Sequence, residues 1–372
     1  MLYREKLFEL NRLMEVHKMR KIHYLNLSAL RVSGILLLLI IPSISFSCVS
    51  HVPSKSVTIN DVLAEKFNKP YGQISDRELR ELTKLPAFER NLTSLEGIQK
   101  LTGLIELNIR GNSISDLSPL SNLTNITNLS AGHNNISDLS PLSKLANLKV
   151  LHLQENKIDD IAPLSNIASL ISLSIGRNQI EDIGPLNQLT NLHNLGISDN
   201  PIQDISALSH LQNLKVLNCA RTQISDISPL LNLKILYWID LSRNQIEDIS
   251  PLSKMTGLNY VILDHNLISD VSSLSNCKFV ERKDNSGMES TLSLESNKIT
   301  DIPSLAGLQV RELDLSRNKI TDIQSLVENS GGITHLLIKE NPLSRDAIDN
   351  QIPLLVKKGI VVGWEGKILG DP

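Results

Sequence analysis

The chain is poor in aromatic residues, in cysteine and in sequence signatures of catalysis. Its 372 residues include five Phe, five Tyr, two Trp and three Cys. It contains no Gly-rich phosphate loop, no cysteine pair at zinc-binding spacing and no serine in a nucleophile elbow. Its 37 basic and 40 acidic residues form no basic stripe of the kind that binds nucleic acid. These absences favour a protein that is not an enzyme, uses no cofactor or metal and binds no nucleic acid.

What the chain does contain is an asparagine that returns every 22 residues inside the unit LxxLxLxxNxIxDIxPLxxL. This unit is typical of a leucine-rich repeat, and about eleven copies predict an α/β solenoid of horseshoe form. The LxL step predicts a short strand, so stacked copies give a parallel sheet on the concave face, with helical or 3-10 turns on the convex side. The recurrent residues are Asn112, Asn134, Asn156, Asn178, Asn200, Asn244, Asn266, Asn297, Asn318 and Asn341.

A recurrent aspartate accompanies this asparagine ladder. Each Asn amide carries donors and an acceptor that can bridge backbone groups of adjacent turns, and we expect the ladder to be weakest at Thr222, which replaces one Asn. Each Asp is predicted to cap a short helical turn that begins at the next residue. A calcium-binding ladder is the rival interpretation, but one carboxylate per turn supplies too few ligands. The aspartates are Asp116, Asp138, Asp160, Asp182, Asp204, Asp226, Asp248, Asp270, Asp301 and Asp322.

Interruptions of the repeat define the organisation of the chain. Residues 57–91 form a predicted helical N-terminal cap, whose capping box runs from Ser75 to Glu78. Leucine-rich repeats occupy residues 92–343, with a polar insertion near 281–290. Residues 344–372 form a predicted C-terminal cap, with a helix over 344–358 that Gly359 stops and a last strand over 360–362.

Residues 60–343 resemble the bacterial internalin-type leucine-rich repeat family. The likeness rests on the 22-residue unit with its Asp-Ile-x-Pro-Leu, and on a cap that contains Ile74-Ser-Asp-Arg-Glu-Leu79 followed by Leu82-Thr-Lys-Leu85. The resemblance implies an exported protein that binds a protein partner through its concave face. The chain departs from the best-known members because it has no Leu-Pro-x-Thr-Gly sorting motif, and because no immunoglobulin-like domain follows the repeats.

Residues 1–48 have the pattern of a signal peptide. Basic residues precede an apolar run over 34–41, which is shorter than the roughly 20 residues of a spanning helix. Cys48 stands where bacterial lipoproteins are cleaved and lipidated, with residues 49–56 as a linker. We therefore expect export to the cell envelope, either as an outer-membrane lipoprotein anchored through Cys48 or as a secreted chain. The acidic residues before Met19 favour Met19 as the true start.

The candidate binding patch comes from the positions that alternate with the buried leucines. Along most of the predicted concave face these positions are small or polar, but Trp238 and Tyr260 fall in one outward column of neighbouring strands. Because exposed Trp and Tyr are common anchors of interfaces, we expect Trp238→Ala to weaken partner binding without lowering the melting temperature. Ile262 completes the apolar part, and the predicted polar rim consists of Asp240, Arg221 and Arg243.

Three further interpretations of the sequence remain open. One is an intracellular phosphatase-regulator-like subunit, which requires that residues 1–50 are not processed. Another is a carbohydrate-binding or structural envelope protein, in which the aromatic pair would stack on sugar rings. A metal site at His133, His152 and Glu155 is the third, although solvated polar side chains explain these residues as well. We expect a monomer, with Cys219 and Cys277 too far apart along the solenoid for a disulfide.

Overall fold

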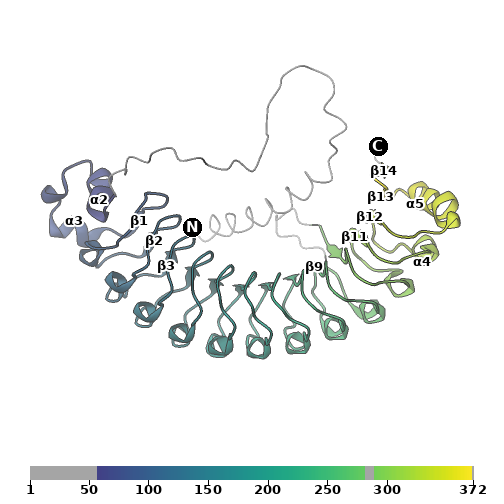
Figure 1. Ribbon diagram of the computed structural model, residues 1–372, viewed down its shortest axis with the longest axis horizontal. Helices are drawn as coiled ribbons and strands as arrows, with labels where there is room; N and C mark the ends of the chain where they lie inside the picture. Colours follow the sequence, from purple (N-terminus) through teal and green to yellow (C-terminus); the bar gives the residue numbers. More distant parts are fainter. Residues whose placement is uncertain (1–56, 281–288, 371–372) are drawn as a thin grey trace, which may run out of the picture. The chain divides into compact units, whose positions relative to one another are not determined.

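The computed structural model describes residues 57–280 and 289–370, and these form one open sheet whose fourteen strands follow one another in chain order. The strands lie on the inner, concave side of an arc of stacked turns (Figure 1). Strands β1 to β13 pair in parallel, and β14 pairs antiparallel with β13. The predicted leucine-rich repeat solenoid is therefore confirmed. The strands are β1 (Lys84–Pro86), β2 (Glu106–Asn108), β3 (Asn128–Ser130), β4 (Val150–His152), β5 (Ser172–Ser174), β6 (Asn194–Gly196), β7 (Val216–Asn218), β8 (Trp238–Asp240), β9 (Tyr260–Ile262), β10 (Thr291–Ser293), β11 (Glu312–Asp314), β12 (His335–Leu337), β13 (Val361–Trp364) and β14 (Lys367–Leu369).

The convex side consists mostly of short 3-10 turns, as the repeat predicts. Each turn closes the chain reversal that returns one strand to the start of the next, and a Pro at its first or second position fixes the backbone in most repeats. The last repeat carries a helical turn, α4 (Gln324–Glu328), in this place. The 3-10 turns are η1 (Tyr71–Gln73) in the N-terminal cap, then η2 (Ile98–Lys100), η3 (Ser118–Leu120), η4 (Ser140–Leu142), η5 (Ala162–Leu164), η6 (Gly184–Gln188), η7 (Ser206–His210), η8 (Ser228–Leu230), η9 (Ser250–Lys254), η10 (Ser272–Asn276) and η11 (Pro303–Leu305).

The core runs the length of the solenoid as a single hydrophobic cluster. In the repeat around β4, Leu148, Leu151 and Leu153 are fully buried, and so is Ile158. Each such side chain contributes about 1.5–3 kcal/mol when it leaves water, and the same positions are filled in every copy. Because each repeat packs mainly on its two neighbours, the terminal repeats need covers.

Two helices cover the N-terminal end of the core. They are α2 (Ile59–Phe67) and α3 (Asp76–Glu81), and Ile59, Leu63 and Leu79 bury their side chains in the core. The predicted capping box at Ser75 and Glu78 is present, since each side chain accepts a hydrogen bond from the other residue's backbone N–H. A second capping box, between Thr58 and Asp61, starts α2. The Lys69 ammonium and the Ser75 backbone N–H lower the pKa of Glu78 to about 2.

The C-terminal cap contains one more strand than the sequence suggested. Its helical segment is a π-helical turn, η12 (Ala347–Gln351), followed by α5 (Ile352–Lys357), and the chain then turns at Gly359 with φ of 84°. Strand β13 continues the parallel sheet, but it is not the last strand, because the chain reverses and adds β14 in the opposite direction. A tight turn at Glu365 and Gly366, both with positive φ, makes this reversal.

Among the described strands, the largest departure from the 22-residue step lies between β9 and β10. Tyr260 in β9 pairs with Thr291 in β10, a step of 31 residues, whereas Trp238 in β8 pairs with Tyr260, a step of 22. The extra residues fall between the two strands, where the sequence has its polar insertion. Residues 281–288 of that insertion, the signal-like segment with Met19 and Cys48, and the linker 49–56 lie outside the described residues. Within 57–280 and 289–370, no helix has the length and apolar character needed to span a membrane.

Candidate protein-binding face

The strands of the concave face are held at their carboxyl ends by the asparagine ladder. Asn134 shows the pattern: its amide nitrogen donates to the carbonyls of Ile109 and Ala131, both at 3.0 Å, and its Oδ1 accepts the backbone N–H of Ile114 at 3.0 Å. One side chain thus satisfies backbone groups of two adjacent repeats, which would otherwise be buried without partners. Every Asn of the predicted ladder repeats this bridging arrangement, from Asn112 to Asn341.

Thr222 interrupts this ladder. Its hydroxyl donates to the Cys219 carbonyl at 3.0 Å, within its own repeat, and lies 2.7 Å from Oδ1 of Asn244 in the next repeat. The backbone N–H of Ile202, which an Asn at position 222 would reach, instead donates to the carbonyl of Asn200. The link between the repeats of β6 and β7 therefore contains fewer side-chain hydrogen bonds than its neighbours.

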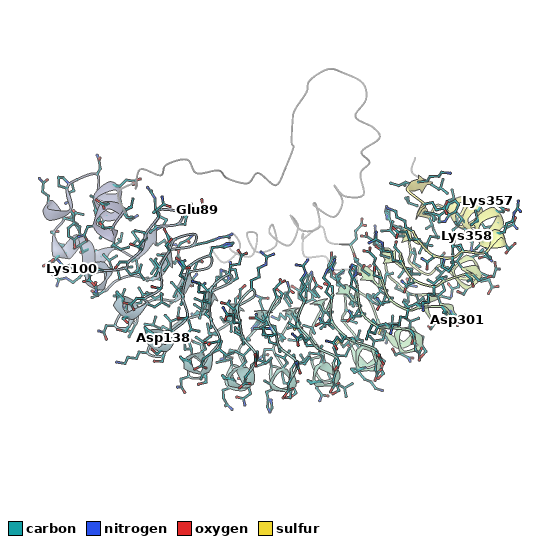
Figure 2. The ribbon with its side chains drawn as sticks, in the orientation of Figure 1. Glu89, Lys100, Asp138, Asp301, Lys357 and Lys358 are labelled. Carbon is teal, nitrogen blue, oxygen red and sulfur yellow. The ribbon has the colours of Figure 1, made fainter. Side chains whose placement is uncertain are left out.

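The aspartates stabilise the convex turns, but the turns begin one residue later than predicted. Ser140 N–H, for example, donates to Asp138 Oδ1 at 2.8 Å, and this Ser is the first residue of η4. Asp301 differs because the corresponding residue is Pro303, which has no N–H, and Asp301 accepts only from the Thr300 hydroxyl. Asp138 and Asp301 both lie on the outer side of the arc (Figure 2). These carboxylates serve as caps, and among the described residues no group of three or more His, Cys, Asp or Glu is placed to hold a metal ion.

A second asparagine ladder runs along the opposite edge, before the strands, and was not predicted. Asn125, Asn147, Asn191 and Asn213 each donate from Nδ2 to a carbonyl of the preceding repeat at 2.9 Å. These residues follow the 22-residue spacing, except that Ser169 takes the place of Asn between Asn147 and Asn191 and donates from its hydroxyl to the Leu148 carbonyl. After Asn213 this ladder ends, because its next position is Ile235, whose side chain is 46% exposed.

Trp238 and Tyr260 form a stacked pair on the concave face. They are directly paired in register on β8 and β9, and their rings are parallel within 2°, with centroids 5.7 Å apart. Asp240 and Ile262 are paired in the next column of the same strands. The alternation of side chains therefore placed these four residues correctly.

The expectation that this aromatic pair is exposed is wrong. Only 5% of Trp238, 8% of Tyr260 and 2% of Ile262 is accessible to solvent. Parallel stacking is one reason, because each ring covers a face of the other. Their neighbours in the same columns, Thr291 and Ser293, are buried as well. The pair is therefore part of the packed surface of the sheet, and its ring edges are the parts that a partner would meet.

Two buried carboxylates lie in the same part of the sheet: Asp264 comes just after β9, and Asp314 is the last residue of β11. Asp264 accepts hydrogen bonds from the Ser293 hydroxyl and from the Glu295 N–H, and Asp314 accepts one from the Ser316 N–H at 2.9 Å. Burial, helped by the charges of Asp264 and Glu295, raises the pKa of Asp314 to about 7. This carboxyl therefore gives up its proton at a much higher pH than an exposed aspartate does.

A row of charged side chains follows the carboxyl ends of the strands. Its members occupy the position just before the ladder Asn, and all have positive φ, between 53° and 58°, a conformation that costs non-Gly residues energy. From His133 to Arg221, basic and acidic side chains alternate from one repeat to the next. Along this part of the row, the side-chain nitrogen and oxygen atoms of each neighbouring pair lie within 4 Å of each other. We call these residues the charged rim: His133, Glu155, Arg177, Asp199, Arg221, Arg243, His265, Arg317 and Glu340.

The three-residue metal hypothesis is not supported by the positions of its members. His133 belongs to the charged rim, where its Nδ1 lies 2.7 Å from Glu155 Oε2 and its Nε2 lies 2.9 Å from the Arg110 guanidinium. A guanidinium at the second ring nitrogen leaves no room there for a cation. His152 lies in a different column, at the end of β4.

The two cysteines within the described residues are buried thiols. Cys219 and Cys277 are free and buried. Burial raises the pKa of both thiols, that of Cys277 to about 11. Cys277 borders a shallow hollow of about 360 Å³ beside the insertion, together with Phe279 and Lys278. A thiol with this pKa stays protonated at neutral pH, so the hollow does not contain an activated nucleophile.

Comparisons with known proteins agree with this geometry. The family described as Leucine Rich repeats (2 copies) matches residues 124–166 and 168–210. No curated protein matches the chain. An internalin, InlF, of Listeria monocytogenes is 30% identical, with 82% of this chain and 86% of that chain covered and a TM-score of 0.73.

Two further solved structures extend this comparison. Internalin C2 of the same organism is 37% identical and has a TM-score of 0.54; the matched region comprises 55% of this chain and 91% of internalin C2. A leucine-rich repeat protein of Leptospira interrogans is 24% identical and has a TM-score of 0.68; the matched region comprises 77% of this chain and 73% of the Leptospira chain. At that identity the Leptospira structure supports the fold alone.

The open parallel sheet, the convex 3-10 turns and the bridging asparagines define a leucine-rich repeat protein. The helical N-terminal cap and the similarity to InlF are more specific. The chain belongs to the internalin-type leucine-rich repeat proteins. Proteins of this type generally act in protein–protein interaction.

Proposed function

We propose that this chain is a non-enzymatic scaffold of a bacterial cell envelope, which holds a protein partner on its concave face. The observation that carries the proposal is the contrast between the two faces of each strand. The inward position of β4 to β9 is always Leu, Ile or Val, whereas the first outward position changes from Val150 through Ser172 and Asn194 to Trp238 and Tyr260. The fold constrains the inward positions, so the outward columns are free to carry recognition.

The convex face is less suited to this task. Its polar side chains are already used as caps, such as Asp182 to the Gly184 N–H at 2.7 Å and Asp204 to the Ser206 N–H at 2.7 Å. The concave sheet, by contrast, is continuous over fourteen strands, which at about 4.8 Å per strand offers a face on the order of 60 Å long. A face of that length accommodates a whole protein domain.

Within this face we place the binding patch at Trp238, Tyr260 and Ile262, with Asp240, Arg221 and Arg243 as its rim. Arg221 and Arg243 are exposed, and Asp240 is half-buried. Since the rings are largely covered, their part in binding is to hold the surface rigid and to offer ring edges, while the rim residues make the polar contacts. A sugar stacking between the two rings is disfavoured, because the rings already occupy each other's faces.

The envelope location rests on the sequence before the repeats. Basic residues, a short apolar run and Cys48 in a lipoprotein-like position support export with a lipid anchor. The intact mass of the native protein, taken from separated membrane and soluble fractions, tests this part. A diacylated Cys48 supports the anchored form, a free terminus near Cys48 supports secretion, and an intact Met1 or Met19 in the cytoplasm contradicts export.

The binding face is tested by photo-crosslinking in the native cell. A photoreactive residue at Asn194, on the concave face, is compared with one at Lys144, an exposed residue of a convex loop. We expect a discrete cross-linked protein from position 194 and none from position 144. Cross-linking from Lys144 alone, or equally from both positions, would contradict the assignment of the concave face.

A further inference from the structure

One arginine of the charged rim, Arg243, has no carboxylate partner in the part of the chain that the structure describes. Arg177 lies 2.8 Å from Glu155 and 3.6 Å from Asp199, and Arg221 lies 3.5 Å from Asp199. Further along, Arg317 lies 3.3 Å from Glu295 and 3.0 Å from Glu340. Of the ion pairs formed within residues 57–280 and 289–370, none includes Arg243.

The two neighbours of Arg243 in the rim do not compensate its charge. On one side is Arg221, which occupies the equivalent position one repeat earlier and is itself a cation, with its guanidinium 3.5 Å from Asp199 of the repeat before. On the other side is His265, whose Nε2 lies 3.3 Å from Arg243 Nη2. Burial, together with the Arg243 charge, lowers the pKa of His265, so this ring is neutral at pH 7 and accepts the hydrogen bond.

The nearby carboxylates are committed elsewhere. Asp264 accepts from Ser293 and Glu295, which belong to the following repeat. Asp240 accepts the Ser242 N–H at 3.0 Å. Neither comes within 4 Å of the Arg243 guanidinium. Two like charges in adjacent repeats repel each other. Each of the remaining arginines of the charged rim has a carboxylate beside it, and among the described residues Arg243 does not have this compensation.

We propose that the rim at Arg221 and Arg243 receives an acidic segment of the partner protein, whose Asp or Glu side chain supplies the carboxylate that residues 57–280 and 289–370 do not place beside Arg243. This inference rests on the proposed function and adds the chemical class of the partner surface. A guanidinium binds a carboxylate through two parallel hydrogen bonds, which is the geometry that an Asp or Glu of the partner would offer. The site adjoins the carboxyl ends of β7 and β8, so the same segment reaches the Trp238 and Tyr260 columns.

The experiment measures binding of two labelled peptides to the purified chain. One alternates aspartate and phenylalanine, and the other has lysine in place of aspartate. We expect the aspartate peptide to bind and the lysine peptide not to, with affinity that falls as ionic strength rises, because salt screens exposed charges. Arg243→Gln should weaken binding by about tenfold. Arg177→Gln is the matched control, since Arg177 is already paired with two carboxylates, and it should leave binding unchanged.

A charge reversal separates binding from folding. Arg243→Glu continues the alternation of the rim, so we expect a thermal midpoint no lower than that of the wild type together with loss of aspartate-peptide binding. The inference is overturned if the aspartate peptide does not bind, if both peptides bind equally, or if Arg243→Gln binds like the wild type. The proposed function does not depend on these outcomes, because cross-linking of the native partner from position 194 tests it independently.

Discussion

The Thr222 hydroxyl lies 2.7 Å from Oδ1 of Asn244, so the one rung of the ladder that is not asparagine still contacts the next rung. Unlike the asparagines of the ladder, the Thr222 side chain makes no hydrogen bond to the preceding repeat. Thr222→Asn adds donors and an acceptor that reach that repeat. We expect the free energy of unfolding to rise by about 1–2 kcal/mol, measured by urea denaturation. Asn200→Thr is the converse change and should lower it by a similar amount; a Thr222→Asn variant no more stable than the wild type would contradict this account.

The aspartate caps provide a matched pair of substitutions. Asp182→Ala removes the 2.7 Å bond from the Gly184 N–H and should cost about 1 kcal/mol of unfolding free energy. Asp301→Ala should cost less than about 0.5 kcal/mol, because Pro303 has no N–H to lose. Thermal and urea unfolding of the two variants tests the comparison. Equal losses would mean that these carboxylates stabilise the turns by some route other than the backbone hydrogen bond.

Asp314 makes stability depend on pH. Its pKa rises from 3.8 to about 7 in the folded state, so between these values the folded chain holds a proton that the unfolded chain has lost. The contribution of this residue to stability is therefore greatest below pH 4 and declines as the pH rises towards 7. Asp314→Asn keeps an acceptor for the Ser316 N–H and removes the ionisation. We expect this variant to be more stable than the wild type at pH 8, with a smaller gap at pH 4, in urea unfolding at both values; a gap that does not change with pH would contradict the prediction.

The burial of Trp238 changes the expected result of its truncation. The sequence suggested a Trp238→Ala variant of unaltered melting temperature, but a ring that is 5% exposed and stacked on Tyr260 contributes to folding. We now expect Trp238→Ala to lower the unfolding free energy by about 2–3 kcal/mol. Trp238→Phe, which keeps an aromatic face against Tyr260, should lower it by less. If the melting temperature of Trp238→Ala equals that of the wild type, the stacked pair does not stabilise the sheet.

Repetition made most of the fold predictable. A unit that recurs every 22 residues identifies each buried leucine many times over, so errors at single positions do not alter the result. The two ends lack this redundancy, and there the sequence did not reveal β14, because Lys367, Ile368 and Leu369 have no repeat partner to compare with. The turns after the aspartates begin one residue later than predicted for another reason. The Asp side chain accepts the N–H of the residue two positions later, and the spacing of the aspartates does not show whether it binds that N–H or the one directly after it.

The candidate site was predictable in position and not in environment. Alternation along β8 and β9 placed Trp238, Tyr260 and Ile262 in the correct columns. It did not reveal their burial, which depends on how closely neighbouring columns pack. The charged rim had a sequence signal, since its residues recur just before each ladder Asn. Only the distances show that, among the residues that the structure places, Arg221 has a carboxylate partner and Arg243 has none.

The antiparallel strand β14 also affects how one molecule meets another. A solenoid that ended on β13 would present a strand edge of the same direction as every strand before it, to which the first strand of a second molecule could add in continuation of the stack. Because β14 runs against β13, an arriving parallel strand finds the hydrogen-bonding pattern of the wrong polarity. An added strand would have to pair with β14 in the antiparallel sense, so we expect the hairpin of β13 and β14 to disfavour head-to-tail stacking of molecules and its removal to favour that form of aggregation.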